Sequence, residues 1–318
     1  MQNKIKAKVV ADSISEDLIR ITTLEIEYPR IVHSEFLKHR MLSSNSASSR
    51  AIPFNKMCEQ LTGEPVVYGS NKSGMQDGGR HSTPVQHIEV AHNGRATVCH
   101  LSPEQAWLNA KESAIYSAKQ YSDAGYHKQV FNRLTEPFQT IKCVVTATEW
   151  INFFWLRDDD AADPTIRELA KTMRKAIDDS VPMKLSDSQW HLPYVHTDAY
   201  GKYYLSKGGD ELELEDAKKV SVARCAAVSY RNVDYTLDKC KEVWGRLIGS
   251  DRKHASAFEH QAKPMYRTED SLYEDINISN YPDTWENGVS HMDKFERLWS
   301  GNLKGWVQLR KTIDNESL

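Results

Sequence analysis

Two helix starts of the same design constrain the fold of this chain most. Ser102-Pro103 and Asp163-Pro164 each place a helix-capping side chain before a proline, which suits the first helical position. Apolar residues then recur at helical spacing. After the first start they are Trp107, Ala110, Ala114, Ala118 and Tyr121, with Gly125 as the stop; after the second they are Ile166, Leu169, Ala170, Met173 and Ile177. We therefore expect two amphipathic helices, each with one face against another layer.

Strand signals lie between and before these helices. The runs KIKAKVVA (4–11) and LIRITTLEIEY (18–28) flank the polar SISED and predict a β-hairpin. A second hairpin is expected in VQHIEVAHNGRATVCH (85–100), around Asn93-Gly94, after a Gly- and Ser-rich loop at 69–84. The mixture predicts an α/β (α+β) fold, a mixed sheet with packed helices, in one domain over 1–318 with an inserted loop and hairpin at 69–101.

Four further segments have a less regular pattern. We expect a helix over 31–42, an apolar stretch over 141–157, a solvated connection over 208–219 and a helix over 236–248. The last of these would bury Cys240, Val243, Trp244 and Leu247.

Composition excludes several classes of protein. The formal net charge of −3 over 318 residues argues against a nucleic-acid-binding surface, so an anionic ligand would need a local cluster of cations. No stretch approaches the ~20 apolar residues of a membrane span, and the N-terminus has no apolar signal core, so we expect a cytoplasmic protein without membrane contact. The five cysteines are odd in number and show no CxxC spacing, which predicts reduced, mostly buried thiols.

Arginines beside small or aromatic residues are the candidates for ligand binding. In KHRMLSSNSASSR (38–50), serines and alanines between Arg40 and Arg50 would let backbone N–H groups approach a phosphate; the alternative is a solvated serine-rich loop. Arg157 follows the apolar WINFFWL and precedes three aspartates. It would lie at the mouth of an apolar pocket, or else form ion pairs with the aspartates at 158–160.

The histidines of the second hairpin could suggest a metal site. His81, His87, His92 and His100, with Cys99, follow no zinc spacing, so we favour a polar hairpin face and no metal. A thiolate nucleophile at Cys99 has no support elsewhere in the chain.

Taken together, these segments resemble the flavin-dependent thymidylate synthases, and in particular a subgroup common in phages. The family signature RHRxxSxNxxSxR matches residues 38–50 at every position but the first. The similarity continues through SNKSGMQ, HKQVFNRLTEPF, VVTATEWINFFWLR, WHLPYV, SVARCAAVSY, HASAFEH and SGNLKGWVQLRK. The resemblance implies reductive methylation of dUMP to dTMP, with the carbon from methylenetetrahydrofolate and the hydride from FAD that NADPH has reduced. It also implies a homotetramer with active sites between subunits, located in the host cytoplasm if the source is viral.

The resemblance also implies roles for individual residues. Arg157 would be the activating catalytic residue and would contact the base. The residues that would bind dUMP are Glu35, Lys38, Ser46, Ser48, Ser49 and Arg50, together with Arg133 from a neighbouring subunit. The residues that would bind FAD are Lys38, His39, Arg40, Ser46, Asn152, His254 and Ser256.

The chain departs from the family pattern at several positions. Lys38 replaces an arginine, Ser46 a glutamate, Asp163 a glutamine and Ala161 a histidine or aspartate. The segments SVARCAAVSY and HASAFEH follow the main motif instead of preceding it, as in a circular permutation. These departures leave open the same chemistry on another pyrimidine, by dCMP methylation or dUMP hydroxymethylation. A non-catalytic nucleotide-binding scaffold is the second alternative.

Overall fold

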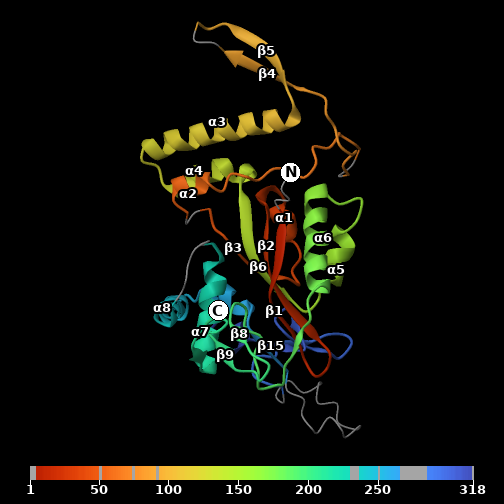
Figure 1. Ribbon diagram of the computed structural model, residues 1–318, viewed down its shortest axis with the longest axis vertical. Coiled ribbons are helices and arrows are strands. Elements are labelled where there is room, and N and C mark those ends of the chain that lie inside the picture. The colour runs from red at the N-terminus through yellow and green to blue at the C-terminus, as the bar shows by residue number, and fades with distance from the viewer. Residues whose placement is uncertain are drawn as a thin grey trace.

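A five-stranded sheet forms the centre of the molecule (Figure 1). The computed structural model describes residues 5–49, 52–73, 76–90, 93–229, 236–249, 251–265 and 285–316. The strand order is β3-β6-β2-β1-β7, and the pairs are antiparallel except β1 with β7. The strands are β1 (Lys6–Ile14), β2 (Arg20–Pro29), β3 (Ser43–Ser46), β6 (Thr140–Ala147) and β7 (Met183–Lys184).

The hairpin of β1 and β2 confirms the first strand prediction. The two strands pair from Lys6 opposite Glu27 to Ile14 opposite Arg20. Strand β2 is central in the sheet, and its Leu24 and Ile26 are fully buried. Strands covered on both faces are rich in apolar residues, which explains the density of Ile and Leu in this segment.

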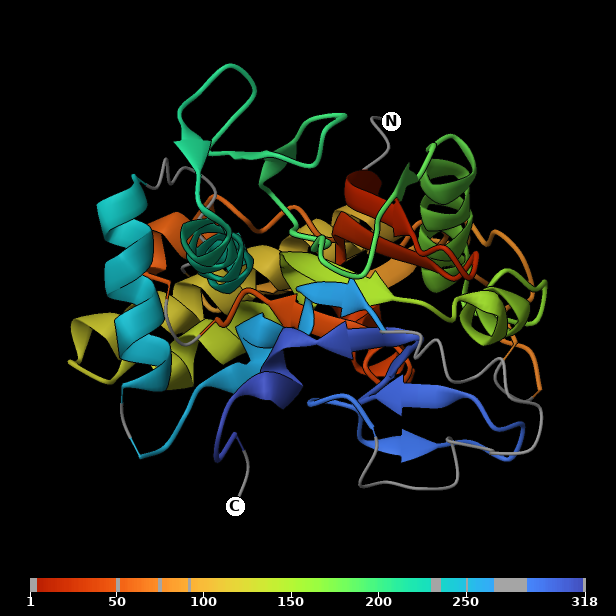
Figure 2. The ribbon, with the colours of Figure 1, turned by 90° about the horizontal axis from the view of Figure 1, so that it is seen from below.

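Helices cover both faces of the sheet. Helices α5 (Ile151–Arg157) and α6 (Pro164–Asp178) pack on one face, and α7 (Leu214–Ala226) and α8 (Leu237–Ile248) lie on the other side (Figure 2). All five apolar residues predicted for α6 are buried, and Asp163 caps the helix as expected. Helix α8 is also confirmed, with Thr236 as its N-cap. Cys240 and Val243 are buried as predicted, whereas Trp244 and Leu247 are only partly buried.

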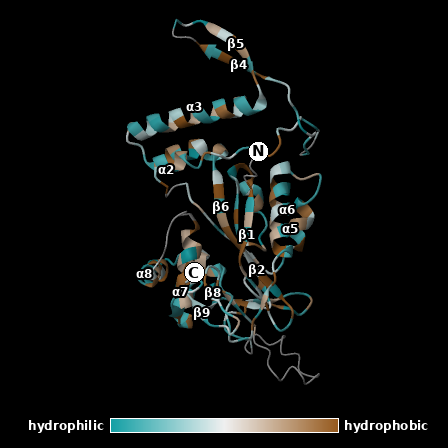
Figure 3. Cartoon of the chain, viewed as in Figure 1, coloured by the Kyte–Doolittle hydropathy of each residue, from teal (hydrophilic) through white to brown (hydrophobic). Residues whose placement is uncertain are grey.

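Helix α3 (Pro103–Asp123) and the hairpin of β4 (Val85–Val90) with β5 (Ala96–Leu101) extend away from the body of the molecule (Figure 1). Ser102 and Gln105 form a complete capping box, so the predicted helix start is confirmed, as is the hairpin about Gly94. The predicted inward face of α3 is confirmed in part. Ala118 is fully buried and Trp107 packs against Phe138 on η2 (Asn132–Phe138), with ring centroids 5.0 Å apart, whereas Ala110 and Tyr121 are exposed. Apolar and polar residues mix along both elements (Figure 3).

Three predictions about local structure are wrong. The helix expected over 31–42 is only η1 (Arg30–Val32) and α1 (His33–Phe36), because the apolar face stops at Phe36 and Leu37 is exposed. The residues that follow pair with β6 as the edge strand β3, where a loop was expected. The solvated connection expected over 208–219 is β10 followed by the first turns of α7, which bury Ala217.

Short elements complete the fold. They are α2 (Phe54–Cys58), α4 (Lys128–Phe131), η2 (Asn132–Phe138), β8 (His196–Thr197), β9 (Tyr203–Tyr204), β10 (Glu211–Leu212), η3 (Ala227–Ser229), η4 (Ala255–Glu259), β11 (Ala262–Pro264), β12 (His291–Met292), β13 (Leu298–Ser300), β14 (Leu303–Lys304), β15 (Trp306–Gln308) and η8 (Leu309–Thr312). None of the helices in the described ranges combines the length and apolarity needed to cross a membrane.

Candidate active site

Arg157 holds two of the other predicted site residues in one cluster. It is the last residue of α5, and its Nε donates to Nε2 of His39 at 2.9 Å. Its Nη1 lies 3.4 Å from Oε2 of Glu35, which is on α1. A guanidinium has five N–H donors, so these two contacts leave donors for a ligand.

The alternative interpretation of Arg157, an ion pair with the aspartates that follow it, is wrong. Asp158 pairs with Arg174, and Asp160 pairs with Arg167. Asp159 accepts a hydrogen bond from the backbone N–H of Ala161. Each aspartate therefore has its own partner on or near α6, and Arg157 is directed to α1 and His39 instead.

His39 is held as a neutral imidazole. Partial burial lowers its pKa, and the positive charge of Arg157 lowers it further. Because Nε2 accepts the hydrogen bond from Arg157, the ring proton lies on Nδ1. The ring also packs edge-on against Phe153, with centroids 4.9 Å apart. His39 can thus orient Arg157 without adding a second positive charge to the cluster.

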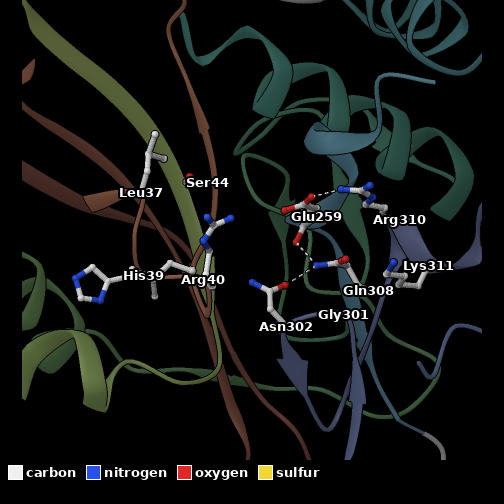
Figure 4. A pocket seen from close by; sticks show the side chains of 11 residues that line it. Leu37, His39, Arg40, Ser44, Glu259, Gly301, Asn302, Gln308, Arg310 and Lys311 are labelled. Atoms are coloured by element: carbon white, nitrogen blue, oxygen red, sulfur yellow. Dashed lines mark hydrogen bonds and ion pairs between the residues drawn. The ribbon is translucent and has the colours of Figure 1, made fainter. Parts of the chain in front are cut away.

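A cavity of about 590 Å³ is lined by one member of this cluster, His39, whereas Glu35 and Arg157 do not line it (Figure 4). One wall comes from the motif region, with Leu37, His39, Arg40, Leu42 and Ser44. The other wall comes from distant segments, with Glu259, Gly301, Asn302, Gln308, Arg310 and Lys311. The volume is typical of pockets that bind a small molecule.

A hydrogen-bond network fixes the amide groups of the second wall. Nε2 of Gln308 donates to the carbonyl of Glu259 and to Oδ1 of Asn302, both at 3.2 Å. Ser43 donates to the same Oδ1 at 3.0 Å, and Nδ2 of Asn302 donates to the carbonyl of Met41. These hydrogen bonds connect β3 to the segment around β15, and so they link the two walls of the cavity directly.

The charges of the cavity are mostly positive. Arg40 is exposed, and no ion pair joins its guanidinium to another residue in the described part of the chain. Across the cavity Arg310 pairs with Glu259, and Lys311 follows on η8 (Figure 4). Such a site suits a ligand with a polar planar ring and an anionic group, because arginine donates to both.

The second half of the motif lies at a different place. Ser49 is buried, and its Oγ donates to Oε1 of Glu136 at 2.7 Å. The side-chain amide of Asn132 donates to the backbone carbonyl of Ser49. Ser48 is exposed, and Ser46 is the last residue of β3, opposite Cys143. In this structure the hydroxyl proton of Ser49 is engaged by a carboxylate; its phosphate role stays a prediction. Arg50 lies outside the described residues.

Several other predicted site residues do not line this cavity. Asn152 and Arg133 are exposed on α5 and η2, and Lys38 is exposed beside His39. His254 lines a separate cavity of about 270 Å³ between α7 and α8, and Ser256 is exposed on η4. Their assigned roles stay predictions.

Sequence reasoning gave no role to six residues that line the cavity. They are Ser44 on the motif wall and Glu259, Asn302, Gln308, Arg310 and Lys311 on the second wall. The available signal was the segment SGNLKGWVQLRK, which contributed to the family resemblance and carries four of the six. In that segment, the polar pair Gly301-Asn302 and the cationic pair Arg310-Lys311 were the signals that could have indicated a ligand-binding site.

The structure shows where Asp163 lies and, in the second hairpin, where His87 lies. Oδ1 of Asp163 accepts from the backbone N–H groups of Thr165 and Ile166 at 2.8 and 3.2 Å, so helix capping accounts for an aspartate there. In the second hairpin, Nε2 of His87 lies 3.0 Å from Nδ2 of Asn109, whereas His92 lies outside the described residues. Within the described ranges no three His, Cys, Asp or Glu side chains come together as a metal site.

Comparison with known proteins identifies one family. The sequence profile described as "Thymidylate synthase complementing protein" matches residues 21–183, half of the chain. The match runs from β2 to β7 and includes Glu35, His39, Arg40 and Arg157. No curated protein sequence matches the chain. The second wall of the cavity lies outside the matched region.

Proposed function

The chain belongs to the thymidylate synthase complementing protein family, the flavin-dependent thymidylate synthases, and is an enzyme of thymidylate synthesis; we propose that it converts dUMP to dTMP. The carbon would come from methylenetetrahydrofolate and the hydride from FAD that NADPH has reduced. The cluster of Glu35, His39 and Arg157, of which His39 lines the cavity, is the observation that supports this proposal most.

Arg157 is suited to the charge that a pyrimidine ring develops during the reaction. Glu35 and neutral His39 hold its guanidinium at the end of α5, so little reorganisation is needed when a ligand arrives. A fixed cation stabilises developing negative charge better than a mobile one, and removing one such donor typically costs about 100- to 1000-fold in rate. Arg157 would polarise the base, and His39 would keep it in place.

The thiols of the chain support a mechanism without a cysteine nucleophile. Cys143, Cys225 and Cys240 are buried, and burial raises the pKa of each; for Cys143 it reaches about 12. A thiol with a raised pKa is a poor nucleophile, since the thiolate is the reactive form. The residues that line the cavity within the described chain include no cysteine. Activation of the base would therefore depend on charge.

The cavity residues suit a flavin. Arg40 and Lys311 would hold its phosphates, and the fixed amides of Asn302 and Gln308 would bind the polar edge of its ring. When bound and reduced, FAD would supply the hydride for the methylation. Leu37 and Leu42 would exclude water from the apolar part of the ligand.

We also propose a homotetramer. Arg133 is exposed on η2 and has no ion pair with another described residue, as expected for a side chain that serves a neighbouring subunit. Helix α3 and the hairpin of β4 and β5 expose Val90, Tyr116 and other apolar residues that contacts between subunits would bury.

The flavin content of the purified protein tests the proposal. We expect a yellow protein that releases one flavin with the spectrum of FAD. A colourless protein that takes up no added FAD would refute the enzymatic proposal and favour a scaffold that binds nucleotide without catalysis.

A further inference from the structure

Arg310 and Lys311 share one carboxylate, that of Glu316. Nε of Arg310 donates to Oε2 of Glu316 at 2.6 Å, and Nζ of Lys311 donates to Oε1. The side chain of Glu316 is only 11 % exposed, although its neighbours Asp314 and Asn315 are exposed. Each oxygen of the carboxylate is thus bound by a different cation on η8.

Both of these cations line the large cavity, whereas Glu316 does not (Figure 4). The charged lining consists of Arg40, Arg310 and Lys311 against Glu259, which leaves two positive charges in excess. Glu259 pairs with Nη1 of Arg310 and makes no ion pair with Lys311. Glu316 therefore supplies from outside the lining the negative charge that the cavity lacks.

The contact of Glu316 with these cations has the geometry of a bound oxyanion. Two donors from consecutive residues take the two oxygens of one planar carboxylate, as they would take two oxygens of a phosphate or of a ligand carboxylate. The donors are partly exposed, at 28 % and 29 %, so water can reach the pairs and exchange is not costly.

We propose that Arg310 and Lys311, with Arg40 on the opposite wall, form an oxyanion subsite that Glu316 fills as an internal carboxylate until an anionic ligand group displaces it. This deepens the proposed function and depends on it only for the choice of ligands. The oxyanion would be a phosphate of FAD or the glutamate carboxylate of the folate.

The backbone around Glu316 permits such a displacement. In the described chain after η8, the N–H of Ile313 donates to the carbonyl of Arg310, and the side chain of Ile313 packs against the core. Beyond Ile313, the backbone is held by the hydrogen bond from Lys253 to the carbonyl of Asp314. A tethered carboxylate competes at high effective concentration, so it would lower the affinity for the ligand without blocking the site.

The test measures how variants bind paired probes, of which one carries the candidate anionic group and the other lacks it. FAD is compared with riboflavin, which has the ring but no phosphate, and folate with pteroate, which lacks the glutamate. Variant Glu316→Gln removes the internal carboxylate, and Lys311→Gln removes one donor. Asp179→Asn removes the same charge from an exposed ion pair with Lys175 on α6 and serves as the control.

If phosphate is the ligand group, E316Q should tighten FAD binding about threefold to tenfold and leave riboflavin unchanged. If the folate carboxylate is the ligand group, the same gain should appear for folate and not for pteroate. In either case K311Q should weaken the responsive probe about tenfold, and D179N should change nothing.

The inference is overturned if E316Q and K311Q leave all four affinities unchanged, or if E316Q binds none of the probes. It is also overturned if E316Q weakens every probe equally and lowers the melting temperature, because a structural clamp would behave in that way. Failure of the proposed function is a separate result: the wild type would then form no dTMP, whatever the affinities of the variants.

Discussion

Acidification should unfold this protein through two buried histidines. Ser13, His191, Thr23, Thr146 and His260 form a hydrogen-bonded chain across the sheet, with successive distances of 2.9, 2.8, 2.7 and 2.9 Å. Both imidazoles are at most 1 % exposed. Burial lowers the pKa of each to about 3.

The sign of the effect follows from the two pKa values. In the unfolded chain a histidine has a pKa of about 6.5, so it binds a proton below that pH while the folded form stays neutral. The stabilisation is complete above pH 6.5 and is lost as the pH falls from 6.5 toward 3. Below pH 6.5, each histidine lowers the free energy of unfolding by about 1.4 kcal/mol per pH unit. At pH 4.5 the two histidines together have lowered it by about 5 kcal/mol. A domain is typically stable by about 5–15 kcal/mol, so this loss is large.

Urea denaturation at a series of pH values between 7.5 and 4.5 measures this effect. The free energy of unfolding should fall with pH, and His260→Gln should reduce the slope by about 1.4 kcal/mol per pH unit, the share of one buried histidine. His100→Gln, at an exposed position on β5, is the matched control. Identical slopes in the parent and in H260Q would refute the reasoning.

Three further predictions concern single residues. Arg157→Ala should lower the rate of dTMP formation by at least about 100-fold while FAD stays bound, as absorbance and product assays will show; an active variant would refute its role. Asp163→Ala should destabilise the fold by about 1 kcal/mol through loss of the α6 cap and should leave the preference for dUMP over dCMP unchanged, whereas a switch of substrate would return Asp163 to the active site. Gly305→Ala should lower the melting temperature, because Gly305 has φ +67° and an added Cβ would lie 2.3 Å from Cδ1 of Ile19; an unchanged melting temperature would contradict this packing.

The sequence predicts the elements whose signals are local. The cap of α6 and the hairpin turn at Gly94 each depend on a few adjacent residues, and both are confirmed. Strand β3 was missed because Ser43–Ser46 contains no strand-forming residue; its conformation comes from pairing with β6, about a hundred residues later in the chain.

The candidate site shows the same limit. Motif residues predicted the wall with His39 and Arg40, and the structure brings Glu35, His39 and Arg157 together as one cluster. The opposite wall depends on how β15 and η8 pack against β3, which no local pattern reveals. The engagement of Ser49 with Glu136 is likewise a contact between distant segments.

The most direct test of the central claim is the product formed from each of two candidate substrates. Purified protein is incubated with NADPH, methylenetetrahydrofolate and either dUMP or dCMP, and the product is identified by its mass. We expect dTMP from dUMP and no change in dCMP. Methylation of dCMP alone, or a hydroxymethyl product from dUMP, would contradict the assignment and leave the flavin and folate chemistry in place.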